Sequence, residues 1–541
     1  MATGLLISTR QNPLCEINVR LLDMLLKRGY NSIRHRFLIL GLKHGFLLHC
    51  APFKTSLNAK NHQSALRNES IVDSKIAKEL ELNRIAGPFK DPPFNQFHVS
   101  PIGLVPKKEH NKYRLIHDLS FPKDGVSVNS SIPRHFTVVS YESLDNVTHI
   151  VTTLGPGCLI AKADVQSAFR ILPAHPRDYP LLGFKWRDHF YYDKRTAMGA
   201  STSCQNFESL SKALAWILTT IFCVRFLCHL LDDFCFFSRA NSEECSVSLK
   251  VFLMLCQNLN IPINEDKTVL PNTTVTVFGI EIDTMLMEAR LPSDKLKKAQ
   301  ISLQSMQDKK SARLYELQSL IGYLQFCCKV VKPGRAFLRR LIALTKGCTK
   351  PNHHIRLSNE SRQDMSMWLT FLNNYNGITM ISPDVWLNSE TIQLFSDAAR
   401  SKGYAVILSN AWCADSWSDN ENYDITILEL YPILLAVLIW GEQLRDKNIL
   451  FFCDNIAVVN ILNNQSSKDP LIMKLVRRFV LQCLNKNINF HLKHIPGQNN
   501  TVSDALSRLQ IKKARQLMPT LDAEPHPVPR IWRLSALLCA H

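Results

Sequence analysis

The sequence predicts a multidomain protein of mixed α/β class, in which short apolar strands alternate with helices. The chain has 541 residues, enough to build several domains with cores of their own. Its hydrophobic content is 46% and its charged content is 20%, a balance that excludes a disordered chain. The pattern of elements changes along the chain, from strands to basic helices and then back to strands. These changes predict five regions, at 1–70, 71–285, 286–387, 388–510 and 511–541.

The chain carries a formal net charge of +18, which makes nucleic acid the leading candidate partner. Many basic proteins bind no polyanion, so the charge alone decides little. The 16 cysteines are spread singly, without the paired spacing of a zinc site. This spacing favours free thiols in a reducing, intracellular compartment, either cytoplasmic or nuclear. The longest apolar run near the N-terminus is broken by Lys43 and His44, so we expect no membrane span.

The first part of the chain predicts helices followed by a β-hairpin. Residues 1–70 contain an amphipathic helix and a polar loop, and their role cannot be read from the sequence. A helix over about 71–85 should end at Gly87-Pro88, a strong stop signal. The stretch 97–120 is typical of two strands joined by a basic turn.

Two adjacent aspartates, Asp232 and Asp233, interrupt a strongly apolar stretch at 226–238. Burying two carboxylates is costly, and a chain keeps such a pair when a divalent cation neutralises it. Magnesium is the usual cation, because it prefers hard oxygen ligands. A solvated Asp-Asp turn at the tip of a hairpin is the alternative. A third carboxylate, Asp164, ends a short apolar strand and can reach the same cation.

The strand ending in Asp164 and the hairpin carrying Asp232 and Asp233 resemble motifs A and C of reverse transcriptases. The Tyr-x-Asp-Asp signature of that family reads Leu-Leu-Asp-Asp here, with Leu230 in place of the tyrosine. The resemblance implies a right-hand polymerase, with fingers and palm over 71–285. It also implies that the three aspartates are catalytic and hold the metal ions.

The same resemblance implies roles for six residues around the nucleotide. Lys107 and Arg114 stand seven residues apart, as does the basic pair that grips the triphosphate in retroviral enzymes; a solvated basic hairpin is the alternative. Phe169 stands where the family carries an aromatic gate against a ribose 2′-OH, although a core phenylalanine fits equally. The other three are Gly199 and Gln205, which match motif B near the template and nucleotide, and Lys267, which matches the motif D lysine near the pyrophosphate.

Residues 286–387 read as basic helices and a linker, and they resemble a thumb-like or connection-like region that follows the palm. Just before them, Phe278-Gly279 matches the motif E strand that grips the primer. Lysines and arginines on these helices could follow the backbone of a duplex, although charges on helices usually form only a solvated face.

Region 388–510 predicts a mixed sheet with four acids at strand ends and helix starts. Asp397 and Asp454 end apolar strands, Glu429 lies in the first turn of a long helix, and Asp504 lies on a short final helix. Each acid alone could be a turn former, a dipole partner or a helix cap. Together, and with HIPGQNNTVSDALSR at the end, they resemble the Asp-Glu-Asp-Asp set of an RNase H domain. Within that resemblance His494 could assist product release.

These resemblances imply an RNA-directed DNA polymerase with RNase H activity, which copies retroelement RNA into DNA and then removes the RNA. Each site would use two Mg²⁺ ions, with Mn²⁺ as a substitute. The implied partners are an RNA template, a DNA primer, RNA–DNA hybrid and dNTPs, with other retroelement proteins, such as a recombinase or a capsid-like protein, beside them. The alternative is a catalytically inactive, nucleic-acid-binding retroelement remnant. A host enzyme of the telomerase kind is a third interpretation, which the RNase H-like region disfavours.

Within reverse transcriptases, the stretches GPFKDPPFNQFHVSPIGLVPKK and RLIHDLSFP resemble DIRS-type, tyrosine-recombinase retrotransposons. Two positions depart from the retroviral pattern. Leu230 replaces the motif C tyrosine, and Met198 stands where retroviral enzymes carry Gln. Neither departure removes a metal ligand, so the resemblance still implies activity, with altered rate or fidelity. The tail at 511–541 is basic and then Pro-rich, and we expect it to be loosely ordered.

Overall fold

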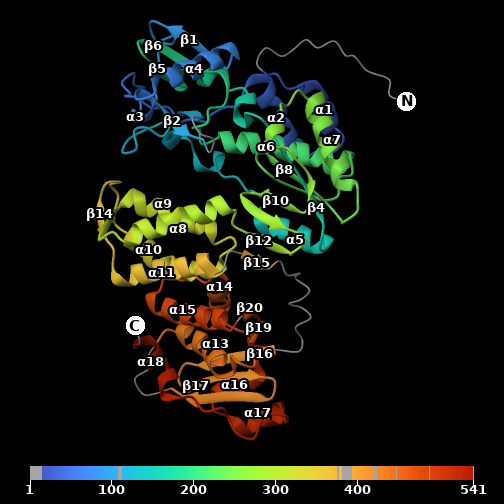
Figure 1. Ribbon diagram of the computed structural model, residues 1–541, viewed down its shortest axis with the longest axis vertical. Helices are drawn as coiled ribbons and strands as arrows, with labels where there is room; N and C mark the ends of the chain where they lie inside the picture. The colour runs from blue at the N-terminus through green and yellow to red at the C-terminus, as the bar shows by residue number, and fades with distance from the viewer. Residues whose placement is uncertain are drawn as a thin grey trace. The chain divides into compact units, whose positions relative to one another are not determined.

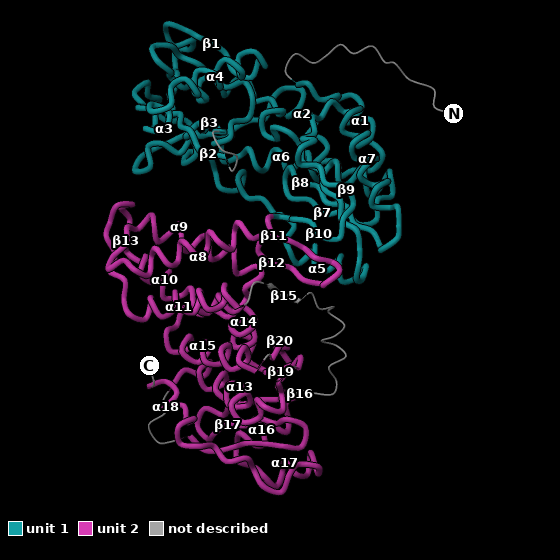
Figure 2. Tube along the Cα trace, viewed as in Figure 1, with its two compact units in different colours: residues 1–278 teal, residues 279–541 magenta. Residues whose placement is uncertain are grey.

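The computed structural model describes residues 15–107, 112–374, 377–379, 393–417, 423–445, 447–486 and 488–539. Contacts divide the chain into two compact units, residues 1–278 and residues 279–541 (Figures 1 and 2). Both units contain helices and strands, which confirms the mixed α/β multidomain class. In the described part of the chain, the helices are too short or too polar to cross a bilayer.

The first unit is built around a four-stranded antiparallel sheet in the order β7-β8-β4-β9. Its strands are β7 (Leu227–Leu230), β8 (Asp233–Ser238), β4 (Leu159–Asp164) and β9 (Val269–Asn272). Phe234 and Phe236 of β8 are fully buried, in one core with residues of the helices α6 (Ser203–Trp216) and α7 (Glu244–Asn258). The remaining elements near this sheet are α5 (Leu144–Leu154) and β10 (Thr274–Val277).

The N-terminal segment belongs to the same core as this sheet. The helices α1 (Val19–Leu26) and α2 (Ser32–His44) bury Leu22, Leu26 and Leu38 against it. The backbone N–H of Asn18 also donates to the Leu259 carbonyl beyond α7, at 2.9 Å. The apolar run 37–49 is therefore largely a helix that covers the sheet domain.

A second group of strands lies beside the N-terminal part of the unit. The predicted hairpin at 97–120 is present as β2 (Ile102–Pro106) and β3 (Tyr113–His117), and its turn at 108–111 lies outside the described residues. A further sheet has the order β1-β6-β5. Its members and covering helices are β1 (Ile85–Phe89), β5 (Gly183–Trp186), β6 (His189–Asp193), α3 (Gln63–Leu66) and α4 (Glu69–Glu81).

The helix expected to end at Gly87-Pro88 ends earlier, so this prediction is wrong. Helix α4 stops at Glu81, and Asn83 then takes a left-handed φ of 52°. The chain enters β1, which pairs with β6, and Gly87-Pro88 lies within that strand. Tertiary pairing with a strand about a hundred residues away therefore overrides the local helix signal.

The second unit begins with short strands and a set of helices. The strands β11 (Ile280–Asp283), β12 (Glu288–Arg290) and β15 (Gly377–Thr379) pair in antiparallel order. The helices are α8 (Ser293–Gln307), α9 (Leu314–Cys327), α10 (Arg339–Leu344) and α11 (Asn359–Asn374), with a small pair of strands, β13 (Ser311–Arg313) and β14 (His354–Arg356).

A five-stranded mixed sheet follows in the same unit, in the order β18-β17-β16-β19-β20 (Figure 1). The strands β16 (Gln393–Ala399), β17 (Gly403–Leu408) and β18 (Ala411–Ser416) are antiparallel, whereas β16, β19 (Asn448–Cys453) and β20 (Asn489–His494) are parallel. The helices are α13 (Ile425–Trp440), α14 (Ile456–Asn464), α15 (Pro470–Asn485) and α16 (Thr501–Ser507). Helix α14 is an addition to the predicted pattern.

A buried arginine on α15 joins the sheet domain to the preceding helices. The Nε atom of Arg477 donates to the Ala336 carbonyl at 3.1 Å, and Nη2 lies 3.7 Å from the Asp364 carboxylate on α11. Arg340 donates to the other oxygen of Asp364 at 3.0 Å. Burial raises the pKa of Asp364 to about 6, against the opposing effect of the two arginines.

In the tail, described to residue 539, most side chains are exposed and a few are packed against the rest of the second unit. Helices α17 (Ile511–Leu517) and α18 (Leu534–Cys539) follow α16. Leu521 is buried in one cluster with Trp412, whose Nε1 donates to the Asp522 carbonyl at 2.9 Å.

Candidate active sites

The structure brings the three palm aspartates together at one end of the four-stranded sheet. Asp164, the last residue of β4, is paired in register with Asp233, the first residue of β8. Asp232 lies in the two-residue turn between β7 and β8, and its carbonyl accepts from the Val165 N–H at 2.9 Å. The pair is at a hairpin tip, as the alternative interpretation had it, but the turn is half-buried rather than solvated.

The turn that carries Asp232 is strained, and a hydrogen bond from helix α6 holds it in place. Leu231 has a φ of 53°, a left-handed conformation that is unfavourable for a bulky side chain. The hydroxyl of Ser211 on α6 is fully buried and donates to the Leu231 carbonyl at 2.8 Å. Its other acceptor, the Phe207 carbonyl, is farther away at 3.3 Å. Ser211 therefore fixes the backbone that sets the position of Asp232.

Two lysines neutralise the palm carboxylates. The Nζ atom of Lys267 lies 3.1 and 3.0 Å from the two oxygens of Asp164, and its side chain is 58% exposed. Lys162, two residues before Asp164 on β4, lies 3.0 Å from Asp233. Burial, and then the charge of Asp164, raises the pKa of Asp232 to about 6. Burial also raises the pKa of Asp164, against the opposing effect of Lys267.

The predicted nucleotide contacts occupy three different places. Lys107 and Arg114 are both exposed at the same end of the β2–β3 hairpin, where Val105 pairs with Arg114. Phe169 is half-buried on a 3₁₀ turn after motif A, and its ring packs edge-on against Phe207, with 5.9 Å between centroids. Phe169 is thus anchored to the core and also partly accessible.

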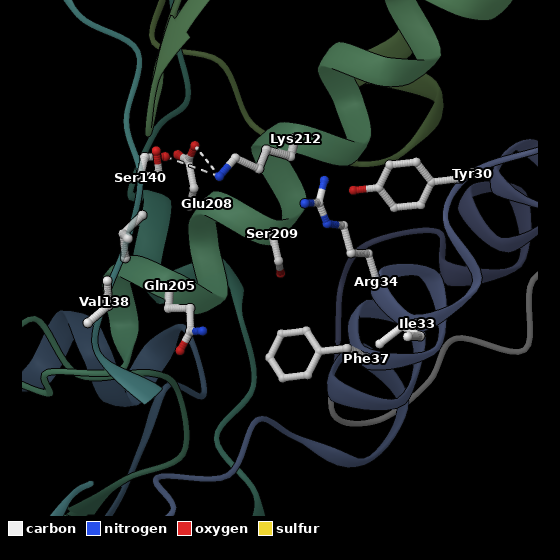
Figure 3. A pocket seen from close by; sticks show the side chains of 11 residues that line it. Tyr30, Ile33, Arg34, Phe37, Val138, Ser140, Gln205, Glu208, Ser209 and Lys212 are labelled. Atoms are coloured by element: carbon white, nitrogen blue, oxygen red, sulfur yellow. Dashed lines mark hydrogen bonds and ion pairs between the residues drawn. The ribbon is translucent and has the colours of Figure 1, made fainter. Parts of the chain in front are cut away.

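Gly199 is required by the backbone of the β2–β3 hairpin. A Cβ atom at this position would lie 1.8 Å from the His117 carbonyl oxygen, so no larger residue fits. The Gly199 carbonyl accepts from the Asn129 amide at 2.7 Å. Gln205, six residues later, lies near the start of α6 and lines a cavity with Arg34 and Val138 (Figure 3).

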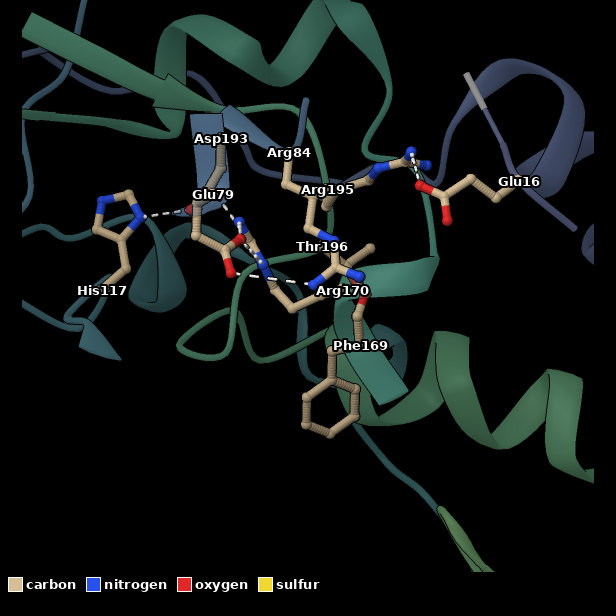
Figure 4. Close-up of polar contacts among 9 residues, drawn as sticks. All are labelled: Glu16, Glu79, Arg84, His117, Phe169, Arg170, Asp193, Arg195 and Thr196. Atoms are coloured by element: carbon tan, nitrogen blue, oxygen red, sulfur yellow. Dashed lines mark hydrogen bonds and ion pairs between the residues drawn. The ribbon is translucent and has the colours of Figure 1, made fainter. Parts of the chain in front are cut away.

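A buried ionic cluster that the sequence does not reveal joins motif A to the finger strands (Figure 4). The guanidinium of Arg170 donates to Glu79 on α4 at 2.7 Å and lies 2.7 Å from Asp193 on β6. The other oxygen of Asp193 lies 3.1 Å from Nδ1 of His117 on β3. Burial alone would raise the pKa of Asp193, but Arg170 and His117 outweigh it and lower that pKa. Arg170 directly follows Phe169, so the cluster fixes the segment that carries that ring.

The four acids of the second unit also converge. Asp397 near the end of β16 and Asp454 just after β19 lie at the same ends of two adjacent parallel strands. Carboxylate oxygens of Glu429 and Asp454 and the Cys453 sulfur lie within 4.8 Å of one another. Asp504 occupies the first turn of α16, as predicted. Glu429 is the fifth residue of α13, just beyond the first turn in which it was predicted.

Burial and mutual repulsion raise the pKa values of these acids. Burial, with Asp397 and Asp454 nearby, raises the pKa of Glu429 to about 9. Burial also raises the pKa of Asp397 to about 6, against a hydrogen bond from the Ser507 hydroxyl. Among the described residues, one Glu429 oxygen is buried without a hydrogen-bond partner.

Three further residues lie at the edge of this site, and the sequence offered a signal for two of them, His494 and Arg508. The ring Nε2 of His494 lies 3.1 Å from the Asp454 carbonyl, which places the histidine beside the acids. Arg508 donates to Asp504 at 2.8 Å, an i to i+4 pair visible in the sequence. Gly497 leaves Asp454 room, because a Cβ there would lie 3.3 Å from its Oδ2.

The oxygen donors of both carboxylate clusters suit divalent cations, and in the second unit Glu429 and Asp454 already bring their oxygens within reach of one ion. Each gathers three or four oxygen donors whose burial and mutual repulsion oppose ionisation, and a bound cation would remove that penalty. Burial raises the pKa of the Cys453 thiol well above its usual value.

No protein-family model matches this sequence. Its curated relatives include the transposon Tf2-3 and Tf2-7 polyproteins of Schizosaccharomyces pombe, which are 21% and 20% identical over 480 and 477 residues. The alignment covers 84% of this chain, and the chain spans about a third (32%) of the length of those relatives. Among solved structures, the foamy viral protease-reverse transcriptase bound to double-stranded DNA is 17% identical, with a TM-score of 0.48 over 90% of this chain and 83% of that one. Its complex with RNA/DNA hybrid is 15% identical with the same TM-score, over 98% and 66% of the two chains.

Proposed function

We propose that this chain is an RNA-directed DNA polymerase with a second, RNase H activity. The observation that carries the proposal is the register pairing of Asp164 with Asp233, with Asp232 in the strained turn between the strands. Converging acids on β16, α13, β19 and α16 support the second activity. Sequence similarity to transposon polyproteins supports a retroelement origin.

In the palm, Asp164, Asp232 and Asp233 would hold two Mg²⁺ ions, with Mn²⁺ as a substitute. Such ions supply activation of the primer 3′-OH and stabilisation of the leaving oxygen. Ser211 fixes the turn, so the carboxylates need little reorganisation. Lys267 is the exposed partner of Asp164, and its ammonium can serve as the proton donor to departing pyrophosphate.

The nucleotide would be held by two basic residues of the β2–β3 hairpin and by the ring of Phe169. Lys107 and Arg114, exposed at one end of the hairpin, suit a triphosphate. Phe169 would oppose a ribose 2′-OH and so favour dNTPs, since its ring is braced against Phe207. Because Gly199 has no side chain, motif B packs directly against the end of the β2–β3 hairpin at His117. The assignment of Gln205 to the template strand rests on its place in the cavity of Figure 3.

In the second site, Asp397, Glu429, Asp454 and Asp504 would hold the two ions, and water would attack the RNA strand of an RNA–DNA hybrid. The 2′-OH and the groove shape identify the RNA strand. His494 lies beside Asp454 and suits product release. The substrates would be an RNA template, a DNA primer and dNTPs for the first site, and the hybrid product for the second.

The element would be of the DIRS type, with a tyrosine recombinase and a capsid-like protein as partners, and would act in the cytoplasm or nucleus. The second candidate is an inactive remnant that only binds nucleic acid. The observation that favours it is Leu230, which pairs with Asp233 where the family carries tyrosine.

Primer extension on poly(rA)–oligo(dT) with Mg²⁺, and with EDTA as the control, decides between them. We expect Mg²⁺-dependent incorporation that D232N abolishes, while hybrid cleavage remains. We expect D454N to do the reverse, since Asp454 belongs to the other site. A folded chain that binds hybrid but extends no primer would support the remnant instead.

A further inference from the structure

A cavity of about 310 Å³ lies within the first unit, between the N-terminal helix α2, the segment 138–140 and one face of α6 (Figure 3). It is not part of the carboxylate cluster. Helix α6 contributes four residues spaced by three or four, so they share one side of the helix. These residues are Gln205, Glu208, Ser209 and Lys212. Helix α2 contributes Ile33, Arg34 and Phe37, and Tyr30 lies two residues before that helix.

The cavity presents one cation, Arg34, that no carboxylate of the described residues neutralises, although it hydrogen-bonds to Tyr30. Lys212 is already used, because its Nζ lies 3.5 Å from Glu208 and 3.1 Å from the Ser140 carbonyl. The Arg34 guanidinium is exposed, lies near the Tyr30 hydroxyl, and has no carboxylate partner among the described residues. A planar guanidinium with free donors suits a phosphate.

The cavity also presents fixed apolar faces. Phe37 is 39% exposed, and its ring is held edge-on by Phe46 at 5.7 Å between centroids. Ile33 and Val138 are 78% and 61% exposed on either side. A rigid, half-exposed ring beside a cation is the arrangement on which single-stranded bases stack.

A buried carboxylate holds one wall of the cavity. Glu208 lines the cavity with 3% exposure, and one of its oxygens faces His229 at 3.3 Å and Lys212 at 3.5 Å. Its other oxygen is buried, without a hydrogen-bond partner in the described part of the chain. Glu208 therefore fixes Lys212 at this wall and leaves Arg34 as the cation open to a ligand.

We propose that this cavity binds one unpaired nucleotide of the nucleic-acid substrate, with its base on Phe37 and its phosphate on Arg34. The proposal rests on the proposed function for the identity of the substrate. It gives the N-terminal helices a role, since α2 supplies both groups. Ser211, which holds the Leu231 turn, lies between Glu208 and Lys212 on α6, so a nucleotide bound here lies one helix away from the catalytic turn.

The test is the binding of the full chain to fluorescent (dT)₁₀ and (rU)₁₀, measured by anisotropy over a range of salt concentrations. We expect R34A to weaken binding and to reduce the slope of log affinity against log salt by about 0.7, the value for one phosphate contact on a single strand. We expect F37A to weaken binding about fivefold or more without changing the slope, and F37W to restore it. The matched control is R36A, which removes the same charge from an exposed position of α2 outside the cavity.

Equal losses in R34A and R36A would overturn the proposal, because they would show only general electrostatic attraction. Unchanged binding in both R34A and F37A would overturn the proposal too, and would favour a protein segment instead of a nucleotide as the ligand of this cavity. Photocrosslinking of 5-iodouracil oligonucleotides should label α2, and labelling elsewhere only would contradict the site. Primer extension separates the two hypotheses, since a chain that extends no primer but shows these binding effects refutes the polymerase and retains the nucleotide site.

Discussion

Replacing Arg170 with methionine tests whether the buried ionic cluster organises the first unit. The side chain of Arg170 is only 13% exposed and neutralises Glu79 and Asp193. Methionine fills much of the same volume but leaves two carboxylates without their cation. Removing one partner of a buried ion pair typically costs about 3–5 kcal/mol. That is a large part of the roughly 5–15 kcal/mol that stabilises a domain.

The stability that R170M loses relative to the wild type should depend on pH. In the wild type the pKa of Asp193 is lowered, so its contribution is complete above the unfolded value of about 3.9 and is lost as pH falls through the folded value. In R170M burial dominates and raises that pKa, so the ionised carboxylate destabilises the fold at neutral pH. The stability difference between R170M and wild type should therefore shrink as the pH falls from about 7 towards 5.

Urea unfolding of the first unit, followed by the fluorescence of Trp186 and Trp216, measures the loss. The matched control is R187M, since Arg187 is 58% exposed and pairs with Asp73 at 2.6 Å, and such surface pairs contribute about 0–1 kcal/mol. Hybrid cleavage by the second unit reports whether the rest of the chain stays folded. Equal stability of R170M and R187M, or unchanged selection of dNTPs over rNTPs in R170M, would refute the reasoning.

Three further substitutions follow from the two sites. Ser211→Ala should slow primer extension about tenfold without affecting hybrid cleavage. The reason is that the Leu231 carbonyl loses its buried donor, a cost of about 1–3 kcal/mol. Equal extension rates in S211A and wild type would show that Ser211 does not position the turn. Phe169→Val should raise incorporation of rNTPs relative to dNTPs in single-nucleotide assays, whereas unchanged selectivity would leave Phe169 a core residue. Glu429→Gln should abolish hybrid cleavage yet raise the melting temperature in EDTA, since it relieves repulsion from Asp397 and Asp454; a lower melting temperature would contradict the buried-charge argument.

The sequence predicted the parts of each site that follow from strand geometry. A strand that ends in Asp164 and a hairpin carrying Asp232 can meet only at one sheet end, and the parallel strands before Asp397 and Asp454 obey the same rule. It could not predict the left-handed Leu231, because no local signal asks for it.

The sequence also could not predict contacts between distant segments. Arg170 and Glu79 are 91 residues apart, and Glu79 lies outside the motifs, so nothing in the sequence pairs them. The early end of α4 has the same cause, since β1 leaves the helix to pair with β6. In the tail, Leu521 is buried against a strand more than a hundred residues earlier, which composition does not reveal.

The contact made by Arg477 limits where the chain can be shortened. A fragment cut between 387 and 388, at the predicted boundary, would expose a guanidinium that the intact second unit buries against Ala336 and Asp364. The complementary fragment would retain Asp364 with only Arg340 to neutralise it. A fragment of the second sheet domain intended for crystallisation should therefore begin near Gly279, where the second unit begins, and include helices α8 to α11, so that the contacts of Arg477 stay buried.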